Sequence, residues 1–159
     1  MESLSITSNG KENIYKEVIP QIKSITCDEP NLIANMANVS AILKEAFNFW
    51  WVGFYLVDQT ELVLGPFQGT LACTRIKYGR GVCGTAWKEA KTIIVKDVEQ
   101  FPGHIACSSL SRSEIVIPIF NSKNKIFAVL DIDSKDLNTF DNLDAQYLKE
   151  VTEIFKATL

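Results

Sequence analysis

A chain of 159 residues is long enough to form one domain that buries a hydrophobic core without disulfides or metals to stabilise it. Hydrophobic residues make up 47% and charged residues 22% of the sequence, as in ordinary globular proteins. The net charge of −3 argues against nucleic acid or a membrane surface as the partner, because phosphate groups are bound by clustered lysine and arginine.

The N-terminal segment, residues 1–11, is polar and is expected to be flexible, within a single domain that spans residues 1–159. It does not resemble a signal peptide. The longest apolar runs, such as residues 114–120, are far shorter than the roughly 20 residues that cross a bilayer. These features predict a cytoplasmic protein, and in that compartment thiols are kept reduced.

The next part of the chain predicts two helices. Residues 12–26 repeat apolar side chains on one helical face, and Pro20 inside this segment predicts a kink or a break. Residues 30–47 carry a stronger repeat of the same period.

Strands are predicted after the second helix. Residues 49–57 are aromatic and β-branched, and a short turn leads from them into a second strand over residues 61–67. Residues 69–73 are expected to continue extended. The glycine-rich loop 79–84 then leads into a short helix over residues 85–89.

The second half of the chain predicts three more strands and a last helix. The strands cover residues 92–95, 114–120 and 125–132, and the irregular segment 97–113 lies between the first two. Asn138 and Thr139 are expected to cap the helix. Helices at both ends of a run of hairpin-joined strands predict an α+β fold, in which an antiparallel sheet carries the N- and C-terminal helices on one face.

The sequence contains four cysteines, Cys27, Cys73, Cys83 and Cys107, and no Cys-x-x-Cys pair, so the usual zinc-knuckle and thioredoxin signatures are absent. Cys107 lies in a polar, serine-rich loop with Arg112 nearby, a setting that favours an exposed and reactive thiol. One interpretation of Cys107 is therefore a reactive thiol that does redox chemistry. The alternative is a small buried hydrophobic residue, which is the favoured interpretation of Cys83.

Two binding motifs have weaker support in the sequence than the reactive cysteine. The pattern Gly-x-Gly-x-x-Gly at residues 79–84 resembles a dinucleotide-binding loop, but no convincing β-α-β unit surrounds it. Three cysteines together with His104, the only histidine, could hold zinc, yet the short paired spacing of structural zinc sites is absent. Anchoring of a loop is the favoured interpretation of His104.

Three carboxylates are predicted to converge at one end of the sheet. Asp131 and Asp133 lie on the same side of a strand because side chains alternate, and Glu114 begins the preceding strand. Carboxylates at close range raise one another's pKa, so that one stays protonated and acts as an acid. The alternative is a set of solvent-facing or turn-capping residues.

Aromatic residues enrich the first predicted strand. Alternation places Trp51 and Tyr55 on one face, with Gly53 leaving a gap between them. One interpretation is an aromatic-walled pocket for a small apolar group, and the other is ordinary core packing.

Four segments form a pattern found in a known family: Gly-Arg-Gly-Val-Cys-Gly-Thr-Ala at 79–86, Phe-Pro-Gly-His-Ile-Ala-Cys at 101–107, Ser-Glu-Ile-Val-Ile-Pro at 113–118 and Leu-Asp-Ile-Asp-Ser at 130–134. Together they resemble the free methionine-(R)-sulfoxide reductases, which are single GAF-domain proteins. The resemblance runs from about residue 31 to the C-terminus and includes all three family cysteines. Most GAF domains are sensor modules that lack this cysteine set, so the match is specific for the enzyme.

The resemblance implies roles for the cysteines. The substrate would be free methionine-(R)-sulfoxide, and the attacking cysteine corresponds to Cys107. The main recycling cysteine corresponds to Cys73, and Cys83 matches a third cysteine whose role is less settled. Cys27 has no counterpart in the motif. Because cysteine carries the redox change, neither a metal nor an organic cofactor is implied.

The resemblance also implies a binding site. Glu114, Asp131 and Asp133 correspond to carboxylates that hold the substrate and help to protonate the sulfoxide oxygen. Trp51 and Tyr55 correspond to the apolar wall around the substrate methyl group. Thioredoxin is the implied reductant, and a homodimer is implied by the family alone. The rival hypotheses are a non-catalytic GAF sensor for a small ligand and a general thiol redox sensor.

Overall fold

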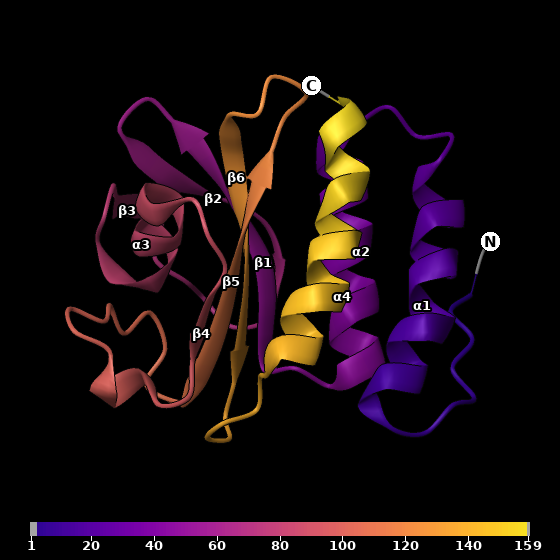
Figure 1. The fold of residues 1–159 in the computed structure, drawn as a ribbon, viewed down its shortest axis with the longest axis horizontal. Coiled ribbons are helices and arrows are strands. Elements are labelled where there is room, and N and C mark those ends of the chain that lie inside the picture. Colours follow the sequence, from indigo (N-terminus) through magenta and orange to yellow (C-terminus); the bar gives the residue numbers. More distant parts are fainter. Residues whose placement is uncertain (1–2, 159) are drawn as a thin grey trace.

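The computed structural model describes residues 3–158 and places a six-stranded antiparallel sheet between helical layers (Figure 1). The strands are β1 (Trp51–Asp58), β2 (Glu61–Gln68), β3 (Arg75–Lys77), β4 (Ile93–Val95), β5 (Ser113–Phe120) and β6 (Ile126–Ser134). They follow the order β3-β2-β1-β6-β5-β4, and every neighbouring pair is antiparallel. The α+β class predicted from the sequence is confirmed.

The helices divide unequally between the two faces of the sheet. They are α1 (Lys11–Thr26), α2 (Leu32–Phe47), α3 (Gly81–Glu89) and α4 (Asn142–Glu153), with the short 3₁₀ turns η1 (Val98–Gln100) and η2 (Ile154–Thr158). Helices α2 and α4 pack on one face of the sheet and α1 packs on them, whereas α3 and the long loops cover the other face (Figure 1). The N- and C-terminal helices therefore share one face, as predicted. No helix within residues 3–158 is long and apolar enough to cross a membrane.

Both faces of the central strands are buried, because side chains on a strand alternate and each face has its own cover. On β5, Ile115, Ile117 and Ile119 point into the core beneath the helices. Val116, between two of them, belongs to a second and smaller cluster beneath α3, which also contains Val82 of that helix. This second cluster forms the floor of the site described below.

Helix α1 runs from Lys11 to Thr26 without interruption, so the break expected at Pro20 is absent. Proline lacks the backbone N–H that would donate within the helix. Pro20 is exposed on the side of the helix away from the core, so the carbonyl group left without this donor faces solvent. Within the N-terminal segment, residues 1–2 lie outside the described part. Beyond them, the Ser5 backbone N–H donates to Gln21 on α1 at 2.9 Å.

Helix α4 is capped by Asp141, not by the expected Asn138 and Thr139. The Asp141 side chain accepts backbone hydrogen bonds from the first turn, and the Asp144 carboxylate accepts in return from the Asp141 N–H at 2.9 Å, which forms a reciprocal capping box. Asp144 is fully buried and also accepts from the Tyr15 hydroxyl at 2.8 Å. One carboxylate thus begins α4 and fixes α1 against it.

Two further expectations differ from the structure. Residues 69–73 form bends and coil, and the chain becomes extended only in β3, which pairs with the outer edge of β2. Helix α3 begins at Gly81 rather than at residue 85.

Candidate active site

Strands β1, β6 and β5 place most of the predicted residues in two rows on the face covered by α3. In the first row, Trp51 lies opposite Asp133, which lies opposite Glu114 on its other side. In the second row, Gly53 lies opposite Asp131. Because alternate side chains share a face, both rows point away from α1, α2 and α4. The three carboxylates therefore converge, as the alternation of residues predicted.

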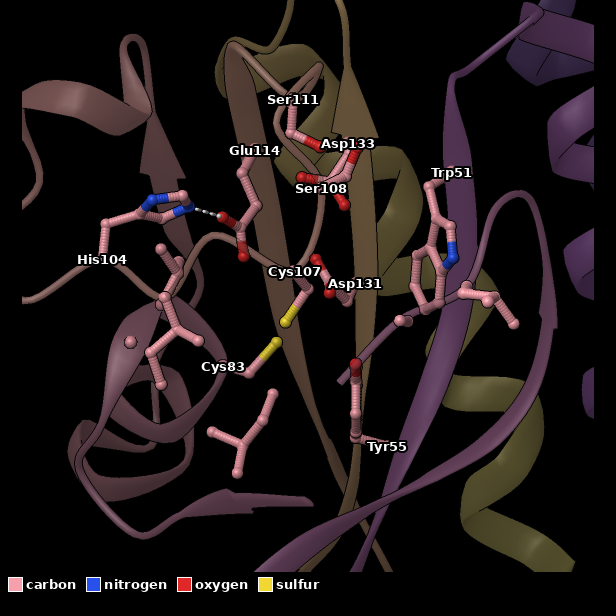
Figure 2. Close-up of a pocket in the computed structure, with 16 residues that line it drawn as sticks. Trp51, Tyr55, Cys83, His104, Cys107, Ser108, Ser111, Glu114, Asp131 and Asp133 are labelled. Atoms are coloured by element: carbon pink, nitrogen blue, oxygen red, sulfur yellow. Dashed lines mark ion pairs between the residues drawn. The ribbon is translucent and has the colours of Figure 1, made fainter. Parts of the chain in front are cut away.

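A small cavity lies over these rows, with a volume of about 40 Å³. Its walls come from the sheet, from the first turn of α3 and from the loops that precede β3 and β5, and they include Cys83, His104 and Cys107 (Figure 2). Small-molecule sites commonly measure about 300 Å³ or more. The cavity therefore has room for a few water molecules in this state, but not for a ligand the size of an amino acid.

A disulfide joins Cys73 to Cys107, the pair that the family resemblance implies. The two Cα atoms are 5.3 Å apart, and the bond ties the loop after β2 to the loop before β5. The Cys107 side chain lines the cavity, where its sulfur faces that of Cys83 (Figure 2). Cys27 and Cys83 are free thiols, the first exposed and the second buried. Only Cys83 has its thiol near the disulfide, because Cys27 follows α1 on the far side of the sheet.

The glycine-rich loop allows the chain to turn tightly into α3, and Cys83 lies in the first turn of that helix. Gly81 begins α3 with φ +62°, a conformation that glycine adopts without strain. Gly84 packs so closely on the preceding turn that an added Cβ would lie 2.5 Å from the Lys77 carbonyl oxygen. Strands on both sides of α3 pair antiparallel, so no parallel β-α-β unit surrounds the motif. The glycines therefore serve the tight entry into α3, and the dinucleotide-binding interpretation is wrong.

Burial and mutual repulsion set the protonation of the acids. Burial raises the pKa of Glu114, Asp131 and Asp133 well above the usual range, and repulsion between neighbouring carboxylates raises each further. Burial also raises the pKa of the Cys83 thiol, with a further increase from the nearby Asp131. The raised pKa values favour the protonated forms of these groups, so the cluster can donate a proton to a bound group.

His104 holds the loop before β5 against the sheet. Its Nε2 lies 3.6 Å from the Glu114 carboxylate, and only 15% of the His104 side chain is exposed (Figure 2). Burial lowers the pKa of the imidazole, so the neutral form predominates at neutral pH. Zinc bound by three cysteines and His104 does not fit this state, because Cys73 and Cys107 are bonded to each other.

The aromatic wall is fixed to the loop that carries Cys73. The Trp51 indole N–H donates to the Thr70 carbonyl oxygen at 3.0 Å, and the Tyr55 hydroxyl donates to the Cys73 carbonyl oxygen at 3.0 Å. The two rings have centroids 6.1 Å apart. Burial raises the pKa of Tyr55, so its hydroxyl stays protonated and keeps donating. Movement of the Cys73 loop must therefore break contacts with both rings.

Replacement of Gly53 by alanine is expected to disrupt this wall. The gap predicted above Gly53 is filled by the side chains of Trp51 and Phe67, and an added methyl group would overlap both. Overpacking of this kind destabilises a fold by about 1–3 kcal/mol. Urea unfolding measures the loss, and near-ultraviolet circular dichroism reports the displaced indole.

Gly65→Ala is the matched control, because its methyl group would meet mainly the flexible end of the Leu56 side chain. An unchanged near-ultraviolet spectrum for Gly53→Ala would show that the wall does not depend on this glycine.

Sequence reasoning missed two contributors to the site. Phe67 stacks on Trp51 with ring centroids 5.3 Å apart, from the neighbouring strand β2. Ser111 lines the cavity and lies close to Asp133 (Figure 2). The pairing of β2 with β1 shifts register between Leu64 and Phe67, which brings Phe67 to the same face as Leu64, so simple alternation would not have found it. Ser111 lies in an irregular loop that gives no periodic signal.

Comparisons with known proteins agree with the geometry. A GAF domain family model matches residues 36–158. GAF domain-containing protein A of Dictyostelium discoideum is 59% identical over 154 residues, which cover 96% of this chain and 97% of that protein.

Several relatives carry an enzyme name, and two of them show the likeness well. The free methionine-R-sulfoxide reductase of Escherichia coli is 44% identical over 143 residues, which cover 89% of this chain and 86% of that protein. The structure of free methionine-R-sulfoxide reductase from Neisseria meningitidis, in complex with its substrate, superposes with a TM-score of 0.97 at 54% identity, and the match covers 99% of this chain and 95% of that one. The chain therefore belongs to the GAF-domain family and, within it, to the free methionine-R-sulfoxide reductases.

Proposed function

We propose that this protein reduces free methionine-(R)-sulfoxide to methionine, with Cys107 as the nucleophile. The observation that carries the proposal is the position of Cys107, whose sulfur lines the cavity beside the buried acids while it is bonded to Cys73. A disulfide between a cavity-lining sulfur and a loop cysteine is the product that such a cycle leaves behind. The Neisseria meningitidis relative, whose structure contains its substrate, supports the choice of sulfoxide.

The chemistry follows from the residues in the cavity. The Cys107 thiolate attacks the sulfoxide sulfur, and a protonated carboxyl group gives its proton to the sulfoxide oxygen, because oxide itself is too basic to leave. The attack forms a sulfur–sulfur bond, and the resulting hydroxyl group then moves from the substrate sulfur to the Cys107 sulfur. As it moves, the substrate's sulfur–oxygen bond and the new sulfur–sulfur bond both break. Methionine departs with the electron pair of the sulfur–sulfur bond, and Cys107 becomes a sulfenic acid. The Cys73 thiol then condenses with the sulfenic acid and releases water, which forms the disulfide. An external dithiol, thioredoxin in this proposal, restores both thiols in the cytoplasm.

The side chains around Cys107 have complementary roles in this proposal. Glu114, Asp131 and Asp133 bind the substrate's ammonium group and supply the proton. Trp51 and Tyr55 flank the methyl group of the sulfoxide. An enclosed cavity selects a free amino acid, because a peptide chain would have no exit.

The size of the cavity indicates the sequence of steps in the proposed cycle. About 40 Å³ does not admit an amino acid, and the disulfide holds the two loops that close the cavity. Reduction of Cys73 and Cys107 must therefore come first and release the loops, after which the sulfoxide binds.

An oxidant comparison tests the proposal. Reduced protein is mixed with one equivalent of free methionine-(R)-sulfoxide, its S epimer, a peptide containing the R epimer, or hydrogen peroxide, and the remaining thiols are titrated. We expect rapid loss of two thiols per chain with the free R epimer alone. Equally rapid loss with peroxide would indicate a general redox sensor. No loss with the R epimer, together with tight binding of a nucleotide, would indicate a non-catalytic GAF sensor.

Replacement of Cys73 by serine separates the two halves of the cycle. We expect one methionine per chain in the first turnover, because Cys107 and the acids are intact, and a strong loss of thioredoxin-driven cycling, because the sulfenic acid has lost its main partner. Methionine release and NADPH consumption in the presence of thioredoxin and its reductase measure the two steps.

Cys83→Ser and Cys27→Ser are the matched controls for Cys73→Ser. Full cycling of Cys73→Ser that disappears in the Cys73→Ser, Cys83→Ser double variant would assign the recycling role to Cys83. Full cycling that persists in the double variant would contradict an intramolecular disulfide step.

A further inference from the structure

A thiol and two carboxylates from three different elements meet beneath the cavity. The Cys83 sulfur on α3, one carboxylate oxygen of Glu114 on β5 and one of Asp131 on β6 all lie within 4.8 Å of one another, and all three residues are buried. The disulfide leaves this thiol free, since Cys73 and Cys107 bond to each other. The cluster therefore persists in the oxidised protein.

One atom of the cluster has an unused acceptor site. Asp131 is 7% exposed, and its buried Oδ1 accepts no hydrogen bond from any described residue. Figure 2 shows this carboxyl group directed into the cavity, facing Cys83 and Cys107. A buried carboxyl oxygen without a donor is unfavourable, and a water molecule or a cation in the cavity would satisfy it.

The cluster also lacks a positive partner. Within residues 3–158, the only basic group paired with any of these acids is His104, whose Nε2 lies 3.6 Å from Glu114. Within the described part of the chain, no lysine or arginine forms an ion pair with Glu114 or Asp131, and a bound divalent cation would supply the missing positive charge.

We propose that the oxidised protein binds one zinc-like divalent cation through Cys83, Glu114 and Asp131, with water in the fourth position. Zinc accepts a mixture of thiolate and carboxylate ligands, whereas magnesium and calcium require oxygen alone. Bond lengths of about 2.0–2.3 Å place tetrahedral ligands roughly 3.3–3.8 Å apart, so movements of about an ångström assemble the site. The cavity of about 40 Å³ accommodates a cation and its water, although it is too small for an amino acid.

His104 completes the arrangement from outside. Hydrogen bonding to a ligating carboxylate fixes its orientation and increases its affinity for metal. The His104 Nε2 lies 3.6 Å from the Glu114 oxygen, so a small movement of the loop before β5 would bring the two into hydrogen-bond range. The inference concerns the oxidised protein and does not rest on reductase activity. If the reductase proposal also holds, zinc and sulfoxide compete for the same acids, and zinc acts as an inhibitor.

Metal titration of the oxidised protein tests the site without any assay of turnover. Protein with the Cys73–Cys107 disulfide intact is titrated with cobalt(II), which reports a bound thiolate through a charge-transfer absorption in the near ultraviolet, and with zinc by calorimetry. We expect one equivalent bound, a thiolate band, and no displacement by excess magnesium. Cys83→Ser should abolish the band, and Asp131→Asn should weaken zinc binding at least about tenfold.

Cys27→Ser is the matched control, since it removes the other free thiol from an exposed position. It should leave the band and the affinity unchanged. Absence of stoichiometric binding, loss of the band in Cys27→Ser, or full binding by both Cys83→Ser and Asp131→Asn would overturn the proposal. Far-ultraviolet circular dichroism checks that each variant is folded, and Asp131→Asn carries the test if Cys83→Ser does not fold.

Discussion

Replacement of Cys107 by serine is expected to abolish reduction of free methionine-(R)-sulfoxide. A hydroxyl group is a poor nucleophile toward sulfoxide sulfur and cannot form a sulfenic acid or a disulfide. Removal of an attacking nucleophile lowers turnover by about 10³-fold or more in well-studied enzymes. The measurement is single-turnover methionine release from fully reduced protein, quantified by chromatography.

The control for Cys107→Ser is Cys27→Ser, because Cys27 is exposed and remote from the cavity. It should release methionine at the rate of the unmodified protein. Methionine release by Cys107→Ser at a comparable rate would contradict the assignment and point to Cys83, the other thiol in the cavity.

Glu114→Gln is expected to lower turnover by about 10²–10⁴-fold, the usual contribution of general acid catalysis. Glu114 lies between His104 and Cys107 in Figure 2, and its raised pKa keeps a proton available beside the attacking sulfur. The amide keeps the size of the side chain but cannot transfer that proton. Steady-state turnover with saturating reductant, measured from pH 6 to pH 10, reports the loss.

The pH dependence has a definite sign. A raised pKa means that the acid is protonated below that pKa and ionised above it, so turnover of the unmodified protein should fall as pH rises through it. Because Glu114, Asp131 and Asp133 interact, this fall belongs to the cluster and not to a single residue. Glu99→Gln, the same change at an exposed position in η1, is the control. An unchanged rate in Glu114→Gln would assign the proton to Asp131 or Asp133.

Most of the fold was predictable from the sequence, because it depends on periodic patterns. The exceptions have local physical causes. Strand β3 has one buried residue, Ile76, between exposed Arg75 and Lys77, so it is too short to show alternation. Helix α3 starts at Gly81, although glycine disfavours helices and its presence predicted a loop. Gly84 occurs inside the helix for a local reason: a larger residue at position 84 would collide with the Lys77 carbonyl oxygen.

The end of the chain shows how neighbouring cap signals compete. Asn138 and Thr139 resemble a helix cap, but the side chains of Asp141 and Asp144 together accept hydrogen bonds from three backbone N–H groups, those of Asp141, Leu143 and Asp144. Asn138 instead adopts a left-handed conformation with φ 52°, and the Thr139 hydroxyl donates to Ser134 at 2.7 Å. The reciprocal Asp141–Asp144 pair was therefore a stronger sequence signal for the start of α4 than Asn138 and Thr139.

The candidate site also has one part that was predictable from periodic patterns and one part that was not. The grouping of Asp131, Asp133 and Trp51 on one face follows from strand alternation and was predictable from the residues alone. Cys73 and Cys107 are 34 residues apart, and each lies in an irregular loop, so no periodic pattern indicates that they meet. Only the family resemblance implied that pair, because loop closure depends on contacts that form after the sheet is built.

The disulfide also changes the thermodynamics of the whole domain. It closes a loop of 34 residues that contains β3, α3, β4 and η1. In the chain-entropy description, a cross-link of this length lowers the entropy of the unfolded state and stabilises the folded one by about 4 kcal/mol. For a domain of this size that corresponds to roughly 10 °C in melting temperature. Each proposed turnover would therefore alternate between a more and a less heat-resistant protein, and depletion of the reductant would leave the resistant form to accumulate.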